Sequence, residues 1–261
     1  MTRQKTKAKR QKTKETHINP DSTDIFCTKR NYNMEEITFG SDKNLSGFIC
    51  GPLGSTGIVV IQEWWGVTPI IKGHAQRLAD NGYRCLIPDL YHGKSTLDKE
   101  EAQHLMGDLD WQGAVQECCQ AVEYLKKEGC TKVIGIGFCM GGALCLAAGQ
   151  HCTLDGAVSF YGTPPNELAQ PENVRIPVQI HVGELDNHVG FSDVPTVDAW
   201  IEKLKAAGGT GVGYTYEDCG HGFLNTGELA QELRKKMQHP EPTEDVQERA
   251  WKRVLEFVNS L

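Results

Sequence analysis

The pattern of apolar and polar positions predicts short strands that alternate with helices. Apolar runs bounded by glycine, proline or polar residues predict strands at 36–39, 47–50, 58–62, 83–87, 132–137, 156–160, 176–182 and 213–217. Apolar residues at helical spacing predict helices at 69–81, 110–128 and 194–207, and a last helix that begins near residue 243. The first two strands are expected to form a hairpin at one edge. This alternation predicts an α/β fold with a mostly parallel, doubly wound sheet and helices on both faces.

Residues 31–261 are predicted to form a single domain, because the chain is long enough for one large core and contains no internal repeat. Residues 1–30 are predicted to be a basic, disordered tail. Seven of the 27 Lys and Arg residues lie within residues 1–14, which contain no acidic residue and almost nothing apolar. We interpret the tail as a solvated extension or a wrongly assigned start; contact with nucleic acid or an anionic surface, and a nuclear address, are the alternatives.

Composition favours a cytoplasmic protein. No run of about 18 apolar residues predicts a membrane span, and the N-terminus lacks the apolar centre of a secretory signal. The ten cysteines are expected to be free in a reducing compartment, because several fall inside predicted elements, where a free cysteine acts as a small apolar residue. These include Cys85, Cys118, Cys119 and Cys145. No cysteine and histidine set has zinc-site spacing, so the sequence predicts no metal and no cofactor.

The segment 137–142, Gly-Phe-Cys-Met-Gly-Gly, follows a predicted strand and precedes a predicted helix. This is the G-x-S-x-G nucleophile elbow with cysteine in the place of serine. Such a turn holds its central residue, here Cys139, in a strained conformation above the carboxyl edge of the sheet. Gly137 and Gly141 would let strand and helix approach closely. A structural cysteine between glycines would give the same local pattern, so the elbow alone is not sufficient.

Two later loops supply the partners in the required order of nucleophile, acid and histidine. Asp186 follows the strand predicted at 176–182, and His221 follows the strand predicted at 213–217. His221 would take the proton of the Cys139 thiol, and Asp186 would orient the imidazole and stabilise its charge. Other polar residues of these loops stay candidates: Glu184 and Asp218 as acids, and His188 and Cys219 as residues that line the cleft or support it.

The chemistry that this triad predicts is hydrolysis of an ester or lactone through an acyl-cysteine. The oxyanion would be held by two backbone N–H groups, that of Met140 at the start of the helix and that of Trp64 after the strand at 58–62. The same helix start would favour a thiolate, because the helix dipole is positive there.

Six segments carry these residues and their neighbours, at 59–66, 88–91, 135–142, 160–162, 183–186 and 220–223. Their order and spacing resemble the dienelactone hydrolase (carboxymethylenebutenolidase) family of the α/β-hydrolase superfamily, over roughly residues 35–261. The resemblance implies the α/β-hydrolase fold, and it favours Asp186 over the neighbouring acids.

The resemblance also implies a role for Glu63, in the segment Gln-Glu-Trp-Trp-Gly. The family's glutamate at this place contacts the resting thiol, and substrate binding is thought to shift it and generate the thiolate. Carried to this chain, Glu63 would regulate the protonation of Cys139. The alternative is a glutamate solvated at the end of a strand. If Glu63 is buried beside the two tryptophans, its pKa should be raised.

Aromatic side chains near the predicted triad are candidates for the substrate pocket, and His92, with Lys94, could attract an anion. The predicted wall consists of Trp64, Trp65, Tyr91, Phe138, Tyr161 and Phe223. The arginines with which the family grips the substrate carboxylate are not matched: one position is His92, and the other lies within Leu224-Asn225-Thr226. A dienelactone is therefore a doubtful substrate, and an uncharged ester or lactone fits equally well.

Two other functions remain open. The chain could be a non-catalytic or redox-regulatory protein that uses Cys139 as a sensor thiol, although a sensor has no need of Asp186. Nucleic-acid binding has support only from the basic tail, because the remainder is strongly acidic and would repel phosphates. The expected partner is thus a small ester or lactone, bound by a monomer or weak oligomer.

Overall fold

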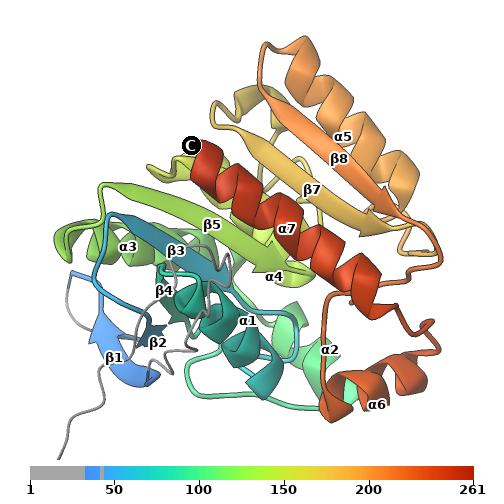
Figure 1. Cartoon of the computed structure of the whole chain (residues 1–261), viewed down its shortest axis with the longest axis horizontal. Coiled ribbons are helices and arrows are strands. Elements are labelled where there is room, and N and C mark those ends of the chain that lie inside the picture. Colours follow the sequence, from blue (N-terminus) through green and yellow to red (C-terminus); the bar gives the residue numbers. More distant parts are fainter. Residues whose placement is uncertain (1–32, 42–43) are drawn as a thin grey trace, which may run out of the picture. The chain divides into compact units, whose positions relative to one another are not determined.

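A computed structural model describes residues 33–41 and 44–261 of the chain. Eight strands form one sheet: β1 (Glu35–Phe39), β2 (Leu45–Cys50), β3 (Thr56–Ile61), β4 (Arg84–Pro88), β5 (Lys132–Phe138), β6 (Gly156–Phe160), β7 (Val178–Gly183) and β8 (Gly211–Tyr216). Their order across the sheet is β1-β2-β4-β3-β5-β6-β7-β8 (Figure 1). The β1–β2 and β2–β4 pairs are antiparallel and all others are parallel. The predicted hairpin edge and mostly parallel sheet are confirmed.

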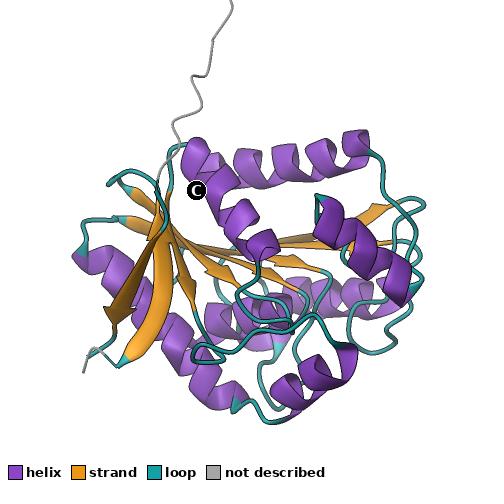
Figure 2. Cartoon of the chain, turned by 90° about the horizontal axis from the view of Figure 1, so that it is seen from below, coloured by secondary structure: helices purple, strands orange, loops and turns teal. Residues whose placement is uncertain are grey.

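Helices cover both faces of the sheet, as Figure 2 shows. They are α1 (Pro69–Asp80), α2 (Lys99–Gly107), α3 (Trp111–Lys127), α4 (Met140–His151), α5 (Val194–Ala206), α6 (Glu228–Met237) and α7 (Glu244–Ser260), with a 3₁₀ turn at Pro171–Asn173. Apolar residues of α3, α4 and α5 pack on one face of the sheet. Those of α1 and α7 pack on the other. Adjacent residues of β3 belong to opposite cores, Val59 to the first and Val60 to the second, because side chains alternate along a strand.

Helices α2 and α6 meet in a third, smaller core, and Leu105 and Met106 of α2 also pack against the first core. Ala102 of α2 packs with Ala230 and Leu233 of α6, and with Trp65 and Ile70 from the segment after β3. In Figure 1 the two helices lie together beyond the carboxyl ends of the strands. They form a small cap at the edge of the sheet where the predicted catalytic loops meet.

The prediction that Cys119 is a free thiol is wrong, because Cys119 of α3 forms a disulfide with Cys152 at the end of α4. Their Cα atoms lie 5.0 Å apart, although 33 residues separate them in sequence. The pairing follows from the packing of α3 beside α4, which the spacing of the cysteines does not reveal. The other cysteines of the described residues are free and buried: Cys50, Cys85, Cys118, Cys130, Cys139, Cys145 and Cys219.

The predicted tail at residues 1–30 lies outside the described residues. Among the residues that the structure does describe, no helix has both the length and the apolar character required to cross a membrane.

Candidate active site

Cys139 lies at a sharp turn between β5 and α4. Its backbone angles, φ 54° and ψ −119°, fall in a region that residues with a side chain rarely adopt. Such a conformation costs on the order of 1–3 kcal/mol, and the surrounding packing must maintain it. The turn is as tight as predicted: a Cβ atom at Gly137 would collide with the carbonyl oxygen of Gly141, and one at Gly141 would collide with that of Gln62. The local geometry is that of a nucleophile elbow.

Asp186 and His221 meet at the same edge of the sheet. Asp186 follows β7, His221 follows β8, and these strands are parallel neighbours, so their carboxyl ends lie side by side. The His221 Nδ1 atom lies 2.7 Å from Oδ2 of Asp186. The Ser192 hydroxyl lies 3.2 Å from the same nitrogen, a contact that the sequence analysis did not anticipate.

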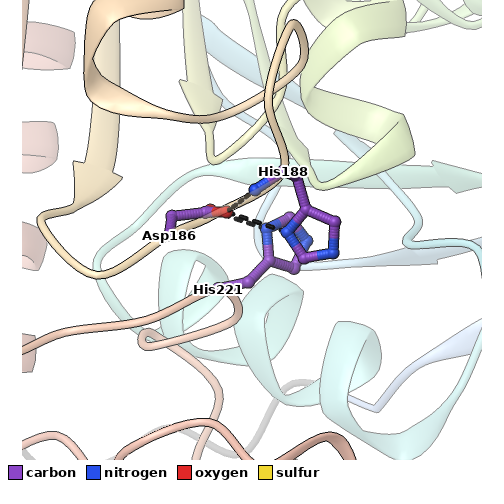
Figure 3. A group of neighbouring side chains, drawn as sticks. All are labelled: Asp186, His188 and His221. Atoms are coloured by element: carbon purple, nitrogen blue, oxygen red, sulfur yellow. Dashed lines mark hydrogen bonds and ion pairs between the residues drawn. The ribbon is translucent and has the colours of Figure 1, made fainter.

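A second imidazole contacts the other oxygen of the Asp186 carboxylate. The His188 Nδ1 atom lies 2.8 Å from Oδ1 of Asp186, and the two histidine rings are 4.5 Å apart. Figure 3 shows the three side chains gathered in this way. Burial alone would raise the pKa of Asp186, but hydrogen bonds from His188 and His221 hold that pKa well below its usual range. Asp186 is therefore a carboxylate at neutral pH. The alternative acids, Glu184 and Asp218, are exposed and contact each other.

The pKa of His221 is shifted in the opposite direction, upward. Burial disfavours its charged form, but the neighbouring Cys139 sulfur and the Asp186 carboxylate outweigh burial and raise the pKa of His221 to about 10. The imidazole is thus protonated at neutral pH in the resting protein, between a sulfur on one side and a carboxylate on the other. Both neighbours favour the protonated form of the imidazole.

Glu63 is buried, with 2% of its surface exposed, which excludes a glutamate solvated at the end of a strand. Its Oε1 atom accepts a hydrogen bond of 2.9 Å from the Asn225 amide, while Oε2 has no hydrogen-bond partner within the described part of the chain. Asn225 is held in turn by the His74 Nε2 atom at 2.9 Å and by the Tyr161 hydroxyl at 3.3 Å. Burial raises the pKa of Glu63, although the Asn225 hydrogen bond opposes the shift. The predicted direction of this shift is confirmed.

These residues open onto one cavity of about 390 Å³. Its apolar wall comes largely from the segment after β3 and from α2, α3 and α6: Trp64, Trp65, Met106, Trp111, Phe191, Ala230, Leu233 and Met237. Its polar groups are Glu63, Cys139, Thr163, His188, His221, Asn225, Arg234 and His239. The cavity has the size and mostly apolar lining of a small-molecule site.

The structure brings only part of the predicted aromatic wall to this cavity. Trp64 and Trp65 line it, and His188 does so as well. The other four predicted wall residues do not line it: Phe138, Tyr161 and Phe223 are fully buried in the core, and Tyr91 is buried with its hydroxyl against the Met140 sulfur. His92, predicted to attract an anion, is exposed beside Glu117. None of these five lines the cavity. The four aromatic residues were selected because they lie near the predicted catalytic motifs, and His92 because it stands where the family has an arginine.

Arg234 is a cavity residue that the sequence analysis missed. Only 5% of its side chain is exposed, and its guanidinium is fully engaged on one side by Glu241, through Nε at 2.9 Å and Nη2 at 2.5 Å. Its Nη1 atom donates to the Asn225 carbonyl oxygen at 2.6 Å. Neither Arg234 nor His239 belongs to a motif, and both enter the cavity only because α6 folds over the carboxyl edge of the sheet.

The sheet order, the elbow and the position of the site define the α/β-hydrolase fold. Comparisons with known proteins agree and narrow the class. The sequence matches the dienelactone hydrolase family over residues 45–261, so the chain belongs to this family. It is a dienelactone hydrolase-like hydrolase, of the class that acts on ester or lactone bonds.

Individual relatives show the extent of the similarity. Protein usf of Aquifex pyrophilus is 33% identical over 196 residues, which are 69% of this chain and 81% of that protein. The carboxymethylenebutenolidase of Pseudomonas putida is 29% identical over 181 residues, 65% of this chain and 75% of that enzyme. A solved structure of a metagenomic dienelactone hydrolase-like promiscuous phosphotriesterase superposes with a TM-score of 0.74 at 22% identity, covering 88% of this chain and 99% of that one.

Proposed function

We propose that the chain is a cysteine-dependent hydrolase of esters or lactones, with Cys139 as nucleophile, His221 as base and Asp186 as orienting acid. The observation that carries the proposal is the 2.7 Å contact between His221 and Asp186, because His221 lines the same cavity as the strained Cys139. A buried cysteine that was only structural would need neither the strained backbone nor the charged neighbours.

The reaction would proceed through an acyl-cysteine. The Cys139 sulfur attacks the carbonyl carbon and a C–S bond forms. When the C–O bond of the ester breaks, the leaving alkoxide takes the proton held by His221. A water molecule then gives a proton to His221 and adds to the thioester, which releases the acid and restores the thiolate. Asp186 keeps His221 in one orientation throughout both halves.

Two backbone N–H groups are proposed to hold the oxyanion. Met140 is the first residue of α4, so its N–H is one of the four at a helix start that have no partner within the helix. Trp64 lines the cavity beside Glu63 on the segment after β3. Removing one such donor typically slows an enzyme by about 100- to 1,000-fold.

Glu63 is proposed to control the charge of Cys139, as its counterpart does in the family. A buried carboxyl with one oxygen lacking a partner favours its protonated form, and the Asn225 amide fixes its orientation. A substrate that fills the cavity would disturb this buried network, which is the step that converts the resting site into the active one.

The proposed substrate is uncharged and apolar near the reacting carbonyl. The cavity wall carries three tryptophans and two methionines, and its one arginine, Arg234, is already neutralised by Glu241. His92, which stands where the family has a carboxylate-binding arginine, lies outside the cavity. A neutral aryl ester or alkyl lactone suits these surroundings better than a lactone that carries a carboxylate.

Replacement of the nucleophile tests the proposal. Cys139→Ala should lower kcat/KM for a neutral aryl ester by at least about 1,000-fold, because the proposed covalent intermediate forms on the Cys139 sulfur. The matched control is Cys130→Ala, a buried cysteine just before β5, at the opposite edge of the sheet. Mass spectrometry of the quenched wild type should detect an acyl group on Cys139. Retained activity in Cys139→Ala would refute the assignment.

A further inference from the structure

Three histidines lie close together among the residues that line the cavity, and the proposed reaction uses only one of them. His188 follows β7, His221 follows β8, and His239 lies between α6 and α7. The ring centres of His188 and His221 are 4.5 Å apart, and each is 6.0 Å from that of His239. Within the described residues, Asp186, His188 and His221 also offer ligand atoms that all lie within 4.8 Å of one another.

We propose that this cluster is a zinc-binding site, in which His188, His221 and His239 hold the ion and Asp186 supports two of them. Zinc binds histidine nitrogen at about 2.0–2.1 Å in tetrahedral geometry, which places the centres of three bound imidazoles roughly 5 Å apart. The observed separations, one of 4.5 Å and two of 6.0 Å, differ from this value by no more than about 1 Å, so small movements of the rings would bring all three within reach of one ion. The set contains nitrogen and sulfur donors, which suit Zn²⁺ and not the oxygen-seeking Mg²⁺ or Ca²⁺.

The hydrogen bonds of Asp186 also support a zinc site. Its two oxygens lie against Nδ1 of His188 and Nδ1 of His221, so the remaining ring nitrogen of each, Nε2, is available to a ligand from the cavity. A carboxylate that accepts the second ring N–H of a metal-bound histidine is the usual support of zinc sites, and its removal typically weakens binding by about 10- to 100-fold. Here one carboxylate would orient two such histidines.

Cys139 would complete the four-coordinate site. Its sulfur neighbours His221, and it lines the cavity with all three histidines. On binding, the one proton between the Cys139 sulfur and Nε2 of His221 passes to solvent, and the sulfur becomes the fourth ligand as a thiolate. Zinc would therefore occupy both the nucleophile and the base. The consequence for turnover, reversible inhibition, rests on the proposed function, whereas the binding itself does not.

Direct binding tests the site without reference to activity. Calorimetric titration of ZnCl₂ into the chelator-treated full chain should give one high-affinity ion per chain, and MgCl₂ should give no binding. His188→Ala and His239→Ala should each weaken zinc binding by at least about 10-fold. The matched control is His104→Ala, a histidine of α2 that does not line the cavity, which should bind zinc like the wild type. Equal affinity in all these variants would overturn the proposal.

Cobalt supplies a second readout that needs no variant of the histidines. Co²⁺ bound to the wild type should show the intense visible bands of a tetrahedral site together with a thiolate charge-transfer band. Cys139→Ser should lose only the thiolate band. Absence of tetrahedral bands in the wild type would overturn the proposal even if a histidine variant failed to fold. If Cys139→Ala proved active, the hydrolytic assignment would fail while these binding measurements still decided the zinc site.

Discussion

A single carboxylate, Asp186, sets the charge of the site by holding two imidazoles. Its side chain is fully buried, and each oxygen lies within 2.8 Å of a histidine nitrogen. An isolated buried carboxylate would be costly, but here hydrogen bonds and a positive neighbour replace the lost hydration. The same contact, together with the Cys139 sulfur, keeps a proton on His221 in the folded protein to well above neutral pH.

This coupling makes stability depend on pH in a definite direction. The pKa of His221 is about 10 when folded and near 6.5 when unfolded, so its contribution is complete below pH 6.5 and is lost as pH rises through 10. Asp186→Asn removes one of the causes of the raised His221 pKa. The loss in free energy of unfolding caused by Asp186→Asn should therefore be larger at pH 6 than at pH 10, by on the order of 1–3 kcal/mol.

Urea unfolding at pH 6, 8 and 10 measures this difference. Asp193→Asn is the control, because Asp193 is the N-cap of α5 and its neighbours within hydrogen-bond distance are a backbone N–H and a hydroxyl, neither of which titrates in this range. Its effect should be the same at all three pH values. A pH-independent effect of Asp186→Asn would show that His221 does not draw its charge from this contact.

At the scale of elements, the catalytic geometry depends on how closely β5 and α4 approach. The elbow has no room for a Cβ atom at Gly137 or Gly141, since backbone carbonyls occupy both positions. α4 is buried along almost its whole length, and Cys139 is its N-cap without a side-chain capping bond. The helix is therefore positioned by packing against the sheet, and this packing holds the backbone of Cys139 in its strained conformation.

Gly137→Ala should consequently damage both stability and activity. The new methyl group would meet the Gly141 carbonyl inside a rigid turn, at a cost of about 2–4 kcal/mol. Gly73→Ala provides the contrast, because Gly73 lies on the exposed side of α1 and a Cβ there meets nothing within 4 Å. That change should raise the free energy of unfolding by about 0.5–1 kcal/mol. Chemical denaturation measures both, and an undamaged Gly137→Ala protein would contradict the close approach.

Elements with a strong apolar period could be predicted from sequence, and those without one could not. The strands, α3, α5 and α7 bury regular apolar faces, so periodicity locates them to within a few residues. Helix α2 buries Ala102 alone, and α6 combines a few apolar residues with many charges. Neither leaves a clear pattern, because they pack on each other and on the cavity. Because α2 and α6 lack a clear pattern, Met106, Leu233 and Arg234 were not among the predicted pocket residues.

At the scale of the whole molecule, the site residues at the ends of strands could be predicted from the sequence, whereas those whose position depends on tertiary packing could not. The proposed triad, Glu63 and the elbow lie at ends of strands, where chain order and local motif indicate their meeting point. His239, Arg234 and Ser192 come from segments whose position depends on tertiary packing, and no motif marks them. The disulfide between Cys119 and Cys152 has the same origin. Sequence therefore indicates the chemistry of this site better than its selectivity.

The charge of the whole molecule affects the choice between anionic and neutral substrates. The chain carries a net charge of −7, which disfavours the approach of anions, and inside the cavity Arg234 is neutralised by Glu241. Glu241 is more than half exposed, so it can be replaced without opening the core. Glu241→Gln should free the guanidinium for an anionic substrate, and should raise kcat/KM for an ester that bears a carboxylate about 10-fold relative to its neutral analogue.

Glu248→Gln separates this local effect from the general change in charge. Glu248 has the same exposed fraction as Glu241, 55%, and it also pairs with an arginine, Arg77, but this pair lies outside the cavity. Both variants remove one negative charge from the molecule, so both should accelerate capture of anions slightly and equally. Only Glu241→Gln should lower KM for the carboxylate-bearing ester. If the two variants behaved alike, Arg234 would have no part in selecting the substrate, and the preference for neutral esters would arise from the apolar wall alone.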